Sequence, residues 1–316
     1  MIMEENMEVD LVYLWVDGGD PEWRKRRNLY SHDSYRDEGM DSEARYADNG
    51  ELKYSLRSAD LYAPWIRKIF IVTDNQVPEW LDATHPKIKI VDHTEILPPE
   101  ALPTFNSTVI EHALYKIPGL SEHFLYANDD MFFNRPVDKS DFFAKDGLPI
   151  IRMTRRPFRK LWYWYLKNVK KYTLNNYNRT IHNSSLLVEK EYARYIGHKT
   201  HHNIDAYLKS DYEATYQKFK EAIYPTLSNH IRNDNDIQRN IYSYVSIMEK
   251  RGHLKFVTQK TSFRCHIEHP HYIEDLKKVN PMLFCINDSQ YADDASHQLV
   301  ADFLKERFPE KSQFEK

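Results

Sequence analysis

Short apolar runs that end in polar side chains recur through the first half of the chain. They lie at residues 11–16, 69–73, 88–91 and 124–127. Stretches with helical spacing, at residues 51–63 and 108–117, lie between them. Uninterrupted apolar runs of this length are typical of strands that are buried on both faces, and their alternation with helices predicts parallel βαβ units. We therefore predict an α/β fold with a Rossmann-like, mostly parallel sheet flanked by helices.

The second half of the chain is predicted to be more helical. Helical patterns cover residues 212–224, 236–250 and 294–308, and one late apolar run, residues 281–286, is typical of a strand. Within the first half, Thr108 and Glu111 form a capping-box pattern that predicts a helix start.

Acidic and amide side chains stand at the ends of the predicted strands. Asp17, Asp74 and Asp129 each follow an apolar run, and the carboxyl edge of a parallel sheet is where ligands bind. Each of these acids alone can equally be a turn former or a helix cap. Asp129 and Asp130 are adjacent carboxylates between two apolar runs, which is costly unless a cation binds them. Asn287 and Asp288 likewise follow an apolar run. Oxygen ligands of this kind suit Mg²⁺ or Mn²⁺.

The histidines and cysteines say less about function than the acidic strand ends do. His198, His201 and His202 cluster ahead of a predicted helix, but no Cys or spaced fourth ligand completes a zinc site. A histidine acting as a general base is the better hypothesis. Cys265 and Cys285 stand in no recognisable nucleophile context, so we expect inert buried thiols.

A basic aromatic stretch, residues 147–188, contains no Asp or Glu and has the run Trp162–Tyr165 at its centre. It predicts either a surface for an anionic acceptor or a membrane interface. The alternative is a solvated basic face whose aromatic rings pack inward. The whole chain has 44 Lys+Arg against 47 Asp+Glu, a net charge of -3, which argues against a nucleic-acid partner.

Targeting signals are not evident in the sequence. The first ten residues are acidic and lack the apolar run of a signal peptide, and no apolar stretch approaches the ~20 residues of a membrane span. Only 2 Cys are present, which is typical of a reducing compartment. We expect a cytoplasmic protein that can work at the inner face of the membrane.

Four blocks of the chain together resemble the Stealth family, the sugar-1-phosphate transferases of microbial capsule synthesis, which also includes the lysosomal-enzyme N-acetylglucosamine-1-phosphotransferase. The blocks are residues 10–21, residues 45–135, residues 198–252 with His202 and the run Asn229–Arg232, and residues 284–314. They occur in the family's order and cover most of the chain. The third block lacks the family's usual Pro shortly after the His.

The resemblance implies a fold of the glycosyltransferase A type and one catalytic domain over residues 1–316. Its parts would be a nucleotide-sugar-binding half (10–135), a variable basic aromatic insert (147–188) and a helical part that completes the site (198–316). The implied reaction transfers a hexose-1-phosphate or N-acetylhexosamine-1-phosphate from a UDP-sugar to a glycan hydroxyl and releases UMP. Alternatives are a metal-dependent glycosyltransferase that releases UDP and a non-catalytic carbohydrate-binding module.

The resemblance also implies roles for single residues. His202 would be the general base, with His198 or His201 as alternatives, and Arg232 would stabilise charge on the phosphoryl oxygens. Mg²⁺ or Mn²⁺ would be held by Asp129, Asp130 and Asp288, with Asp130 alternatively only a partner of Asp129.

The remaining implied residues surround the donor. Asp17 would be a catalytic residue and would also share the nucleotide-sugar pocket with Trp15, Gly18, Asn49, Arg57, Asp74, Asn106, Ser107 and Asn128. The alternative for Arg57 is an ion pair with an acid. The implied partners are the UDP-sugar and a glycan acceptor, including a lipid-linked one, with membrane contact through residues 152–171.

Overall fold

A five-stranded sheet forms the centre of the computed structural model, which describes residues 7–30, 50–269, 271–288 and 291–316. Its order is β3-β2-β1-β4-β8. The strands are β1 (Val9–Leu14), β2 (Ile69–Thr73), β3 (Ile88–Asp92), β4 (His123–Asn128) and β8 (Asp205–Leu208). The first four are parallel, and β8 runs antiparallel to β4. The predicted α/β class with a mostly parallel sheet is confirmed.

Both faces of this sheet are buried, which explains the uninterrupted apolar runs. Val12 packs in one hydrophobic cluster, together with side chains of α8 (Lys209–Lys218) and α10 (Asn240–Met248). Tyr13, the next residue, packs in the opposite cluster with α3 (Glu51–Tyr62). Successive side chains of a strand point to opposite faces, so a strand covered by helices on both sides needs an apolar residue at every position.

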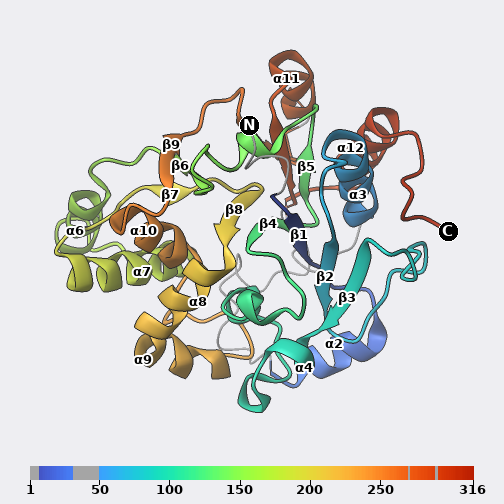
Figure 1. Cartoon of the computed structure of the whole chain (residues 1–316). Helices are drawn as coiled ribbons and strands as arrows, with labels where there is room; N and C mark the ends of the chain where they lie inside the picture. Colours follow the sequence, from blue (N-terminus) through green and yellow to red (C-terminus); the bar gives the residue numbers. More distant parts are fainter. Residues whose placement is uncertain (1–6, 31–49, 270, 289–290) are drawn as a thin grey trace.

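Two smaller sheets complete the fold (Figure 1). The first has the order β10-β11-β5 and consists of β10 (Ser262–His266), β11 (Leu283–Asn287) and β5 (Met131–Phe133). The second has the order β7-β6-β9 and consists of β7 (Lys199–Thr200), β6 (Ile150–Thr154) and β9 (His253–Phe256). Because β5 follows β4 after only residues 129 and 130, the first small sheet continues directly from the end of a central strand.

Further helices surround these sheets. They are α2 (Pro21–Asn28), α4 (His93–Ile96), α5 (Ser107–Glu111), α6 (Arg159–Asn168), α7 (Asn176–Tyr192), α9 (Lys220–Ile223), α11 (His271–Val279) and α12 (Asp294–Arg307). Within the described ranges, no helix is long and apolar enough to cross a membrane.

Three predicted helices differ from the structure. The helix expected over 108–117 is the single turn of α5, capped by Asn106 and not by Thr108, because the Asn106 side chain accepts a hydrogen bond from the Thr108 amide at 3.1 Å. The helix expected over 212–224 begins at residue 209 and is divided into α8 and α9 at Phe219. The helix expected over 236–250 begins at residue 240, because Asp236 is used to accept hydrogen bonds from the loop before it.

Candidate active site

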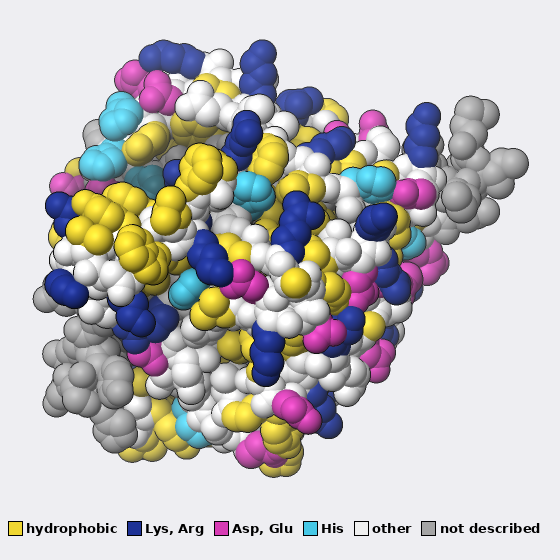
Figure 2. Space-filling model, turned by 90° about the vertical axis from the view of Figure 1, so that its left-hand side faces the viewer, with side chains coloured by type: hydrophobic (Ala, Val, Ile, Leu, Met, Phe, Trp, Pro, Cys, Tyr) yellow, Lys and Arg dark blue, Asp and Glu magenta, His cyan; other side chains and the backbone are white. Residues whose placement is uncertain are grey.

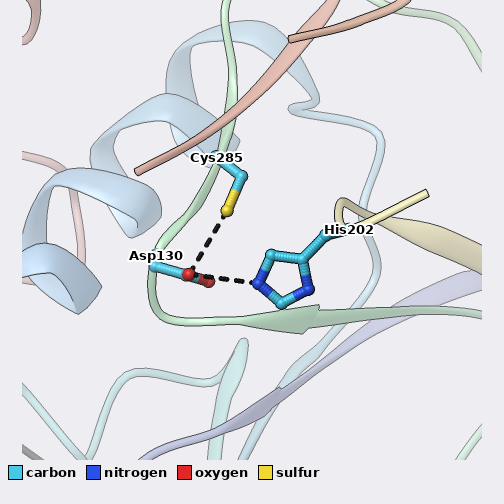
Figure 3. Close-up of side chains that lie close together, drawn as sticks. All are labelled: Asp130, His202 and Cys285. Atoms are coloured by element: carbon cyan, nitrogen blue, oxygen red, sulfur yellow. Dashed lines mark hydrogen bonds and ion pairs between the residues drawn. The ribbon is translucent and has the colours of Figure 1, made fainter. Parts of the chain in front are cut away.

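Three side chains from distant parts of the sequence meet at the turn between β4 and β5 (Figure 3). Asp130 Oδ2 lies 3.4 Å from His202 Nε2 and accepts a hydrogen bond from Cys285 Sγ at 3.2 Å. The turn is joined to β11 by the Ile286 amide, which donates to the Asp130 carbonyl at 2.9 Å. The two acidic strand ends of the sequence, residues 128–130 and 287–288, are therefore brought to the same place.

The geometry keeps His202 neutral and oriented. Burial lowers the pKa of His202 below its ordinary value, although Asp130 acts in the opposite direction. The ring presents Nε2 to Asp130, so the other ring nitrogen points away from the carboxylate (Figure 3). A neutral imidazole held through one nitrogen by a carboxylate can take up a proton on the other, which is the arrangement of a general base.

Cys285 is the site residue that we missed in the sequence. Burial and the neighbouring Asp130 raise its pKa well above the ordinary value, so the side chain is a thiol that donates to the carboxylate. It is inert as a nucleophile, as expected, but it lies in the centre of the site. The available signal was its position two residues before Asn287, which places it on the inner face of the strand that carries the second acidic block.

This group of side chains can hold a metal ion. Asp130, His202 and Cys285 offer ligand atoms that lie within 4.8 Å of one another. Asp130 Oδ1 is buried and has no hydrogen-bond partner among the described residues, so an oxygen ligand is available. A protonated thiol is a poor ligand for a hard cation, whereas carboxylates suit one. Whether a hard cation such as Mg²⁺ fits this site therefore depends on Asp130 and on two further acids, Asp129 and Asp288. Asp288 also pairs with His297 at 3.0 Å.

A second group of predicted residues meets at the start of α5. Arg232 Nη2 donates to Ser107 Oγ at 2.9 Å, and Asn106 Nδ2 donates to Asp236 Oδ2 at 2.9 Å. The Phe105 amide also donates to the His230 carbonyl at 2.7 Å. These contacts attach the loop that carries Arg232 to Asn106 and Ser107, as one site would require.

The turn after β1 is built around Asp17. Its Oδ1 accepts from the Gly19 amide at 2.7 Å, and a Cβ atom at Gly19 would lie only 2.8 Å from that oxygen. Gln76, on the loop after β2, accepts from the Asp17 amide at 2.9 Å and donates to its carbonyl at 3.0 Å. The Gly18 carbonyl accepts from Arg24 at 2.5 Å. The loops after two neighbouring strands are thereby joined at the carboxyl edge of the sheet.

Other predicted pocket residues lie at this edge with partners of their own. Asp74 pairs with Arg26 at 2.6 Å, and Asn128 accepts from the Tyr126 hydroxyl at 2.7 Å. Trp15 is buried, and its Nε1 has no hydrogen-bond partner among the described residues. Since a buried indole N–H without a partner is costly, this donor is available to a ligand.

Arg57 and Asn49 are placed differently. Arg57 donates to both carboxylate oxygens of Glu315, at 2.7 and 2.8 Å, and to the Phe308 carbonyl at 2.7 Å. This favours the alternative in which Arg57 pairs with an acid, here one that anchors the C-terminal segment. Asn49 lies outside the described residues.

A buried ionic network that was not predicted from the sequence lies next to the loop that carries His201 and His202. Arg239 donates to Asp205 Oδ2 at 2.9 Å and lies 3.8 Å from Glu111 Oε2. Asp205 Oδ1 lies 3.1 Å from His201 Nε2, and His201 Nδ1 bonds to Ser262 Oγ at 2.9 Å. His201 therefore has both ring nitrogens engaged in holding the loop.

His198 is engaged as well, since its Nδ1 accepts from the Arg156 amide at 3.0 Å. Of the three clustered histidines, His202 is the one that faces Asp130. The geometry thus favours His202 over the two alternatives.

The basic aromatic stretch exposes much of its aromatic surface. Trp162 and Trp164 on α6 are 55% and 58% exposed, and Phe158 before the helix is 74% exposed. Tyr163 is the buried member of the Trp162–Tyr165 run. Figure 2 shows the side of the molecule that carries α6 and α7, where hydrophobic and Lys or Arg side chains are interspersed. The alternative of inward-packed rings is therefore wrong for both tryptophans.

Comparisons with known proteins find the same family of polysaccharide phosphotransferases over nearly the whole chain. Sequence profiles of Stealth protein conserved regions 1, 2 and 4 match residues 7–35, 45–151 and 275–316. An exopolysaccharide phosphotransferase of Lactiplantibacillus plantarum is 32% identical over 98% of this chain and 96% of its own length. A capsular polysaccharide phosphotransferase of Haemophilus influenzae is 36% identical over 91% of this chain and 80% of its own.

Other relatives are longer or more distant. An exopolysaccharide phosphotransferase of Streptomyces coelicolor is 36% identical over 98% of this chain, which spans only 52% of that relative. Among solved structures, the galactosyltransferase LgtC, determined with donor and acceptor sugar analogues, has a TM-score of 0.45 and 9% identity, covering 94% of this chain and 95% of LgtC.

Proposed function

The chain belongs to the Stealth family, a family of polysaccharide phosphotransferases, and we propose that it transfers a sugar-1-phosphate from a UDP-sugar to a glycan hydroxyl, releasing UMP. The sugar is a hexose or an N-acetylhexosamine. The observation that carries the proposal is the neutral His202, held by Asp130 where the two acidic strand ends meet. This contact supports a proton acceptor beside the proposed diphosphate site.

The proposed step is an in-line displacement at the β-phosphorus. His202 takes the proton of the acceptor hydroxyl as its oxygen attacks, and the bond to the UMP oxygen breaks. Arg232, supported by Ser107 at 2.9 Å, stabilises charge on the phosphoryl oxygens with its planar guanidinium. Phosphoryl transfer needs little covalent help from the protein, so positioning and charge stabilisation by these groups can supply the catalysis.

The proposed cofactor is Mg²⁺ or Mn²⁺, held by Asp130 with Asp129 and Asp288. When bound, such an ion neutralises the charge of a diphosphate and of its leaving group. The unpartnered Asp130 Oδ1 supports this assignment, and Oδ2 of the same carboxylate remains for His202.

The proposed nucleotide pocket lies at the carboxyl edge of β1, β2 and β4. It includes Trp15, whose indole N–H is unpartnered, together with Asp17, Gly18, Asp74 and Asn128. Arg57 is left out, because its fork is already occupied by Glu315.

Product identity tests this function. The protein is incubated with a panel of UDP-sugars, glycan acceptors and Mg²⁺ or Mn²⁺, and the released nucleotide is separated by chromatography. Release of UMP with a phosphodiester-linked product is expected, whereas release of UDP would identify an ordinary glycosyltransferase. Asp130→Asn should abolish turnover, and the exposed Asp146→Asn is its matched control.

A second part of the proposal concerns location. We propose a cytoplasmic protein that rests on the inner face of the membrane through residues 152–171, near a lipid-linked acceptor. Exposed Trp162 and Trp164 beside Lys and Arg side chains support it. Flotation with anionic vesicles is expected for the wild type and not for Trp162→Ser/Trp164→Ser. The exposed Tyr291→Ser should float as the wild type does. Equal flotation of all three would contradict the proposal.

A further inference from the structure

Four basic side chains from three segments gather around the loop that precedes His202. We call Arg156, Arg159, Lys199 and Arg264 the cationic cluster. Lys199 on β7 pairs in register with Thr154 at the end of β6, next to the segment that carries Arg156. A Cβ atom at Gly197 would lie 3.0 Å from Arg159 Cβ and 3.2 Å from the Arg156 carbonyl oxygen, so this backbone lies directly against both residues.

Arg264 reaches the cluster from β10. Side chains alternate along a strand, so Ser262 and Arg264 point to one face while Phe263 and Cys265 are buried on the other. Ser262 bonds to His201 at 2.9 Å, which shows that its face is turned toward the loop of residues 199–203. Arg264 is exposed on that same face.

The cluster has no neutralising acid in the part of the chain that the structure describes. None of its four side chains forms an ion pair there, although Arg159 donates to the Asn178 side chain at 2.6 Å. The Lys199 ammonium lies 4.2 Å from the centre of the Tyr177 ring. Burial and the surrounding arginines lower the pKa of Lys199 to about 7. A buried ammonium without a counter-charge is costly, and an anion bound beside Lys199 would offset that cost.

The position of the cluster indicates which anion it binds. Its residues belong to β7, β10 and the segment leading into α6, not to the carboxyl edge of β1, β2 and β4 where the donor is proposed to bind. Lys199 precedes His202 by three residues, and Arg264 lies two residues after Ser262, which bonds to the neighbouring His201 at 2.9 Å, so both lie near the proposed base. In an in-line displacement the nucleophile arrives opposite the leaving group, so side chains beside the base face the acceptor.

We propose that the cationic cluster is an acceptor subsite that binds a phosphodiester already present in the acceptor glycan. The inference rests on the proposed function, because a sugar-1-phosphate transferase makes a phosphodiester with one negative charge. Each product of the reaction therefore carries the group that the subsite recognises. The enzyme prefers, as its acceptor, a chain made by its own class of reaction.

Kinetics with two matched acceptors test the proposal. One is a synthetic trisaccharide with one phosphodiester linkage, and the other is the neutral trisaccharide with a glycosidic linkage at the same place. Lys199→Gln and Arg264→Gln should each raise KM for the charged acceptor ~10-fold or more, since each removes a charge-assisted contact. KM for the UDP-sugar and for the neutral acceptor should not change. The exposed Lys305→Gln on α12 is the matched control.

Direct binding keeps this test separate from that of the reaction. Calorimetry of the charged trisaccharide with the wild type requires no turnover, and binding is expected to weaken ~10-fold in Arg264→Gln. If Arg264→Gln weakens UDP-sugar binding and leaves acceptor binding unchanged, the cationic cluster belongs to the donor site. If the variant changes neither, the cationic cluster is a solvated surface that binds no ligand. Either result overturns the proposal. Failure to release UMP with normal binding of the charged trisaccharide would refute the proposed reaction alone.

Discussion

Replacing Arg239 with Met should destabilise the fold by about 3–5 kcal/mol, because it leaves two buried carboxylates without their counter-charge. The guanidinium lies 2.9 Å from Asp205 Oδ2 and 3.8 Å from Glu111 Oε2. At an effective dielectric constant of about 20, each pair is worth about 4–6 kcal/mol of attraction. Part of this loss is offset, because Met needs no desolvation and preserves the packing on Tyr126, whose ring lies 4.2 Å from the guanidinium carbon.

The loss should depend on pH in a defined direction. Burial raises the pKa of Asp205, but Arg239 and His201 more than offset this, so its pKa lies below the ordinary value. In the wild type this contribution to stability is present above the unfolded pKa and is lost as the pH falls through the folded pKa. Burial already holds the pKa of Glu111 above its ordinary value in the wild type, and loss of Arg239 raises the pKa of both carboxyls in the folded state of the variant. The variant therefore loses stability as the pH rises, and its deficit is largest at neutral pH.

Urea unfolding followed by tryptophan fluorescence measures both effects. The deficit of Arg239→Met should be about 3–5 kcal/mol near pH 7.5 and clearly smaller near pH 5. Adding Glu111→Gln should restore part of the stability near neutral pH, because one uncompensated charge is removed. The exposed Arg194→Met serves as the control. A deficit below about 1 kcal/mol, or one equal at both pH values, would refute the electrostatic account of the network.

Three other substitutions test the site itself. His202→Ala should lower kcat ~10²–10⁴-fold and leave UDP affinity, measured by calorimetry, unchanged; a normal rate would move the role of base to His198. Because the pKa of His202 is held low, wild-type kcat/KM should stay flat until the pH falls below about 6.5 and decline only beyond that. Arg232→Lys should lower kcat about 10²-fold, since an ammonium cannot contact two phosphoryl oxygens as a fork, whereas equal loss of donor affinity would indicate ground-state binding. Arg57→Gln should cost about 1–3 kcal/mol in urea unfolding with KM for the UDP-sugar unchanged, and the reverse pattern would return Arg57 to the nucleotide pocket.

The central strands could be predicted because their burial is a local property of the sequence. Each residue from Leu11 to Leu14 of β1 and from Ile69 to Val72 of β2 packs in one core or the other, so the apolar run is visible without knowledge of its neighbours. The polar blocks at 128–130 and 287–288 could each be predicted as a strand end, whereas their convergence depends on the pairing of β5 with β11. Both follow buried strands, and the Ile286 amide contacts the Asp130 carbonyl at 2.9 Å.

Helix boundaries and the identity of the site histidine were harder to predict. Asn106 caps α5 because its side chain is fixed between the Thr108 amide and Asp236, a residue far along the chain. His201 and His202 are equivalent in a sequence pattern. They differ in the structure because Asp205 and Ser262 hold the first, while Asp130 faces the second.

The sequence by itself determined the α/β class, the positions of the buried strands along the chain and the acids at their ends, because hydrophobic periodicity and turn residues act over a few positions. Only the tertiary structure decided that Cys285 donates to Asp130, that Arg239 joins Glu111 to Asp205, and that the strands of Lys199 and Arg264 meet at the loop that carries His201 and His202. The Cys285 contact depends on the pairing of β5 with β11, the place of Asp205 on that of β4 with β8, and the place of Lys199 on that of β6 with β7, and no local pattern contains these registers.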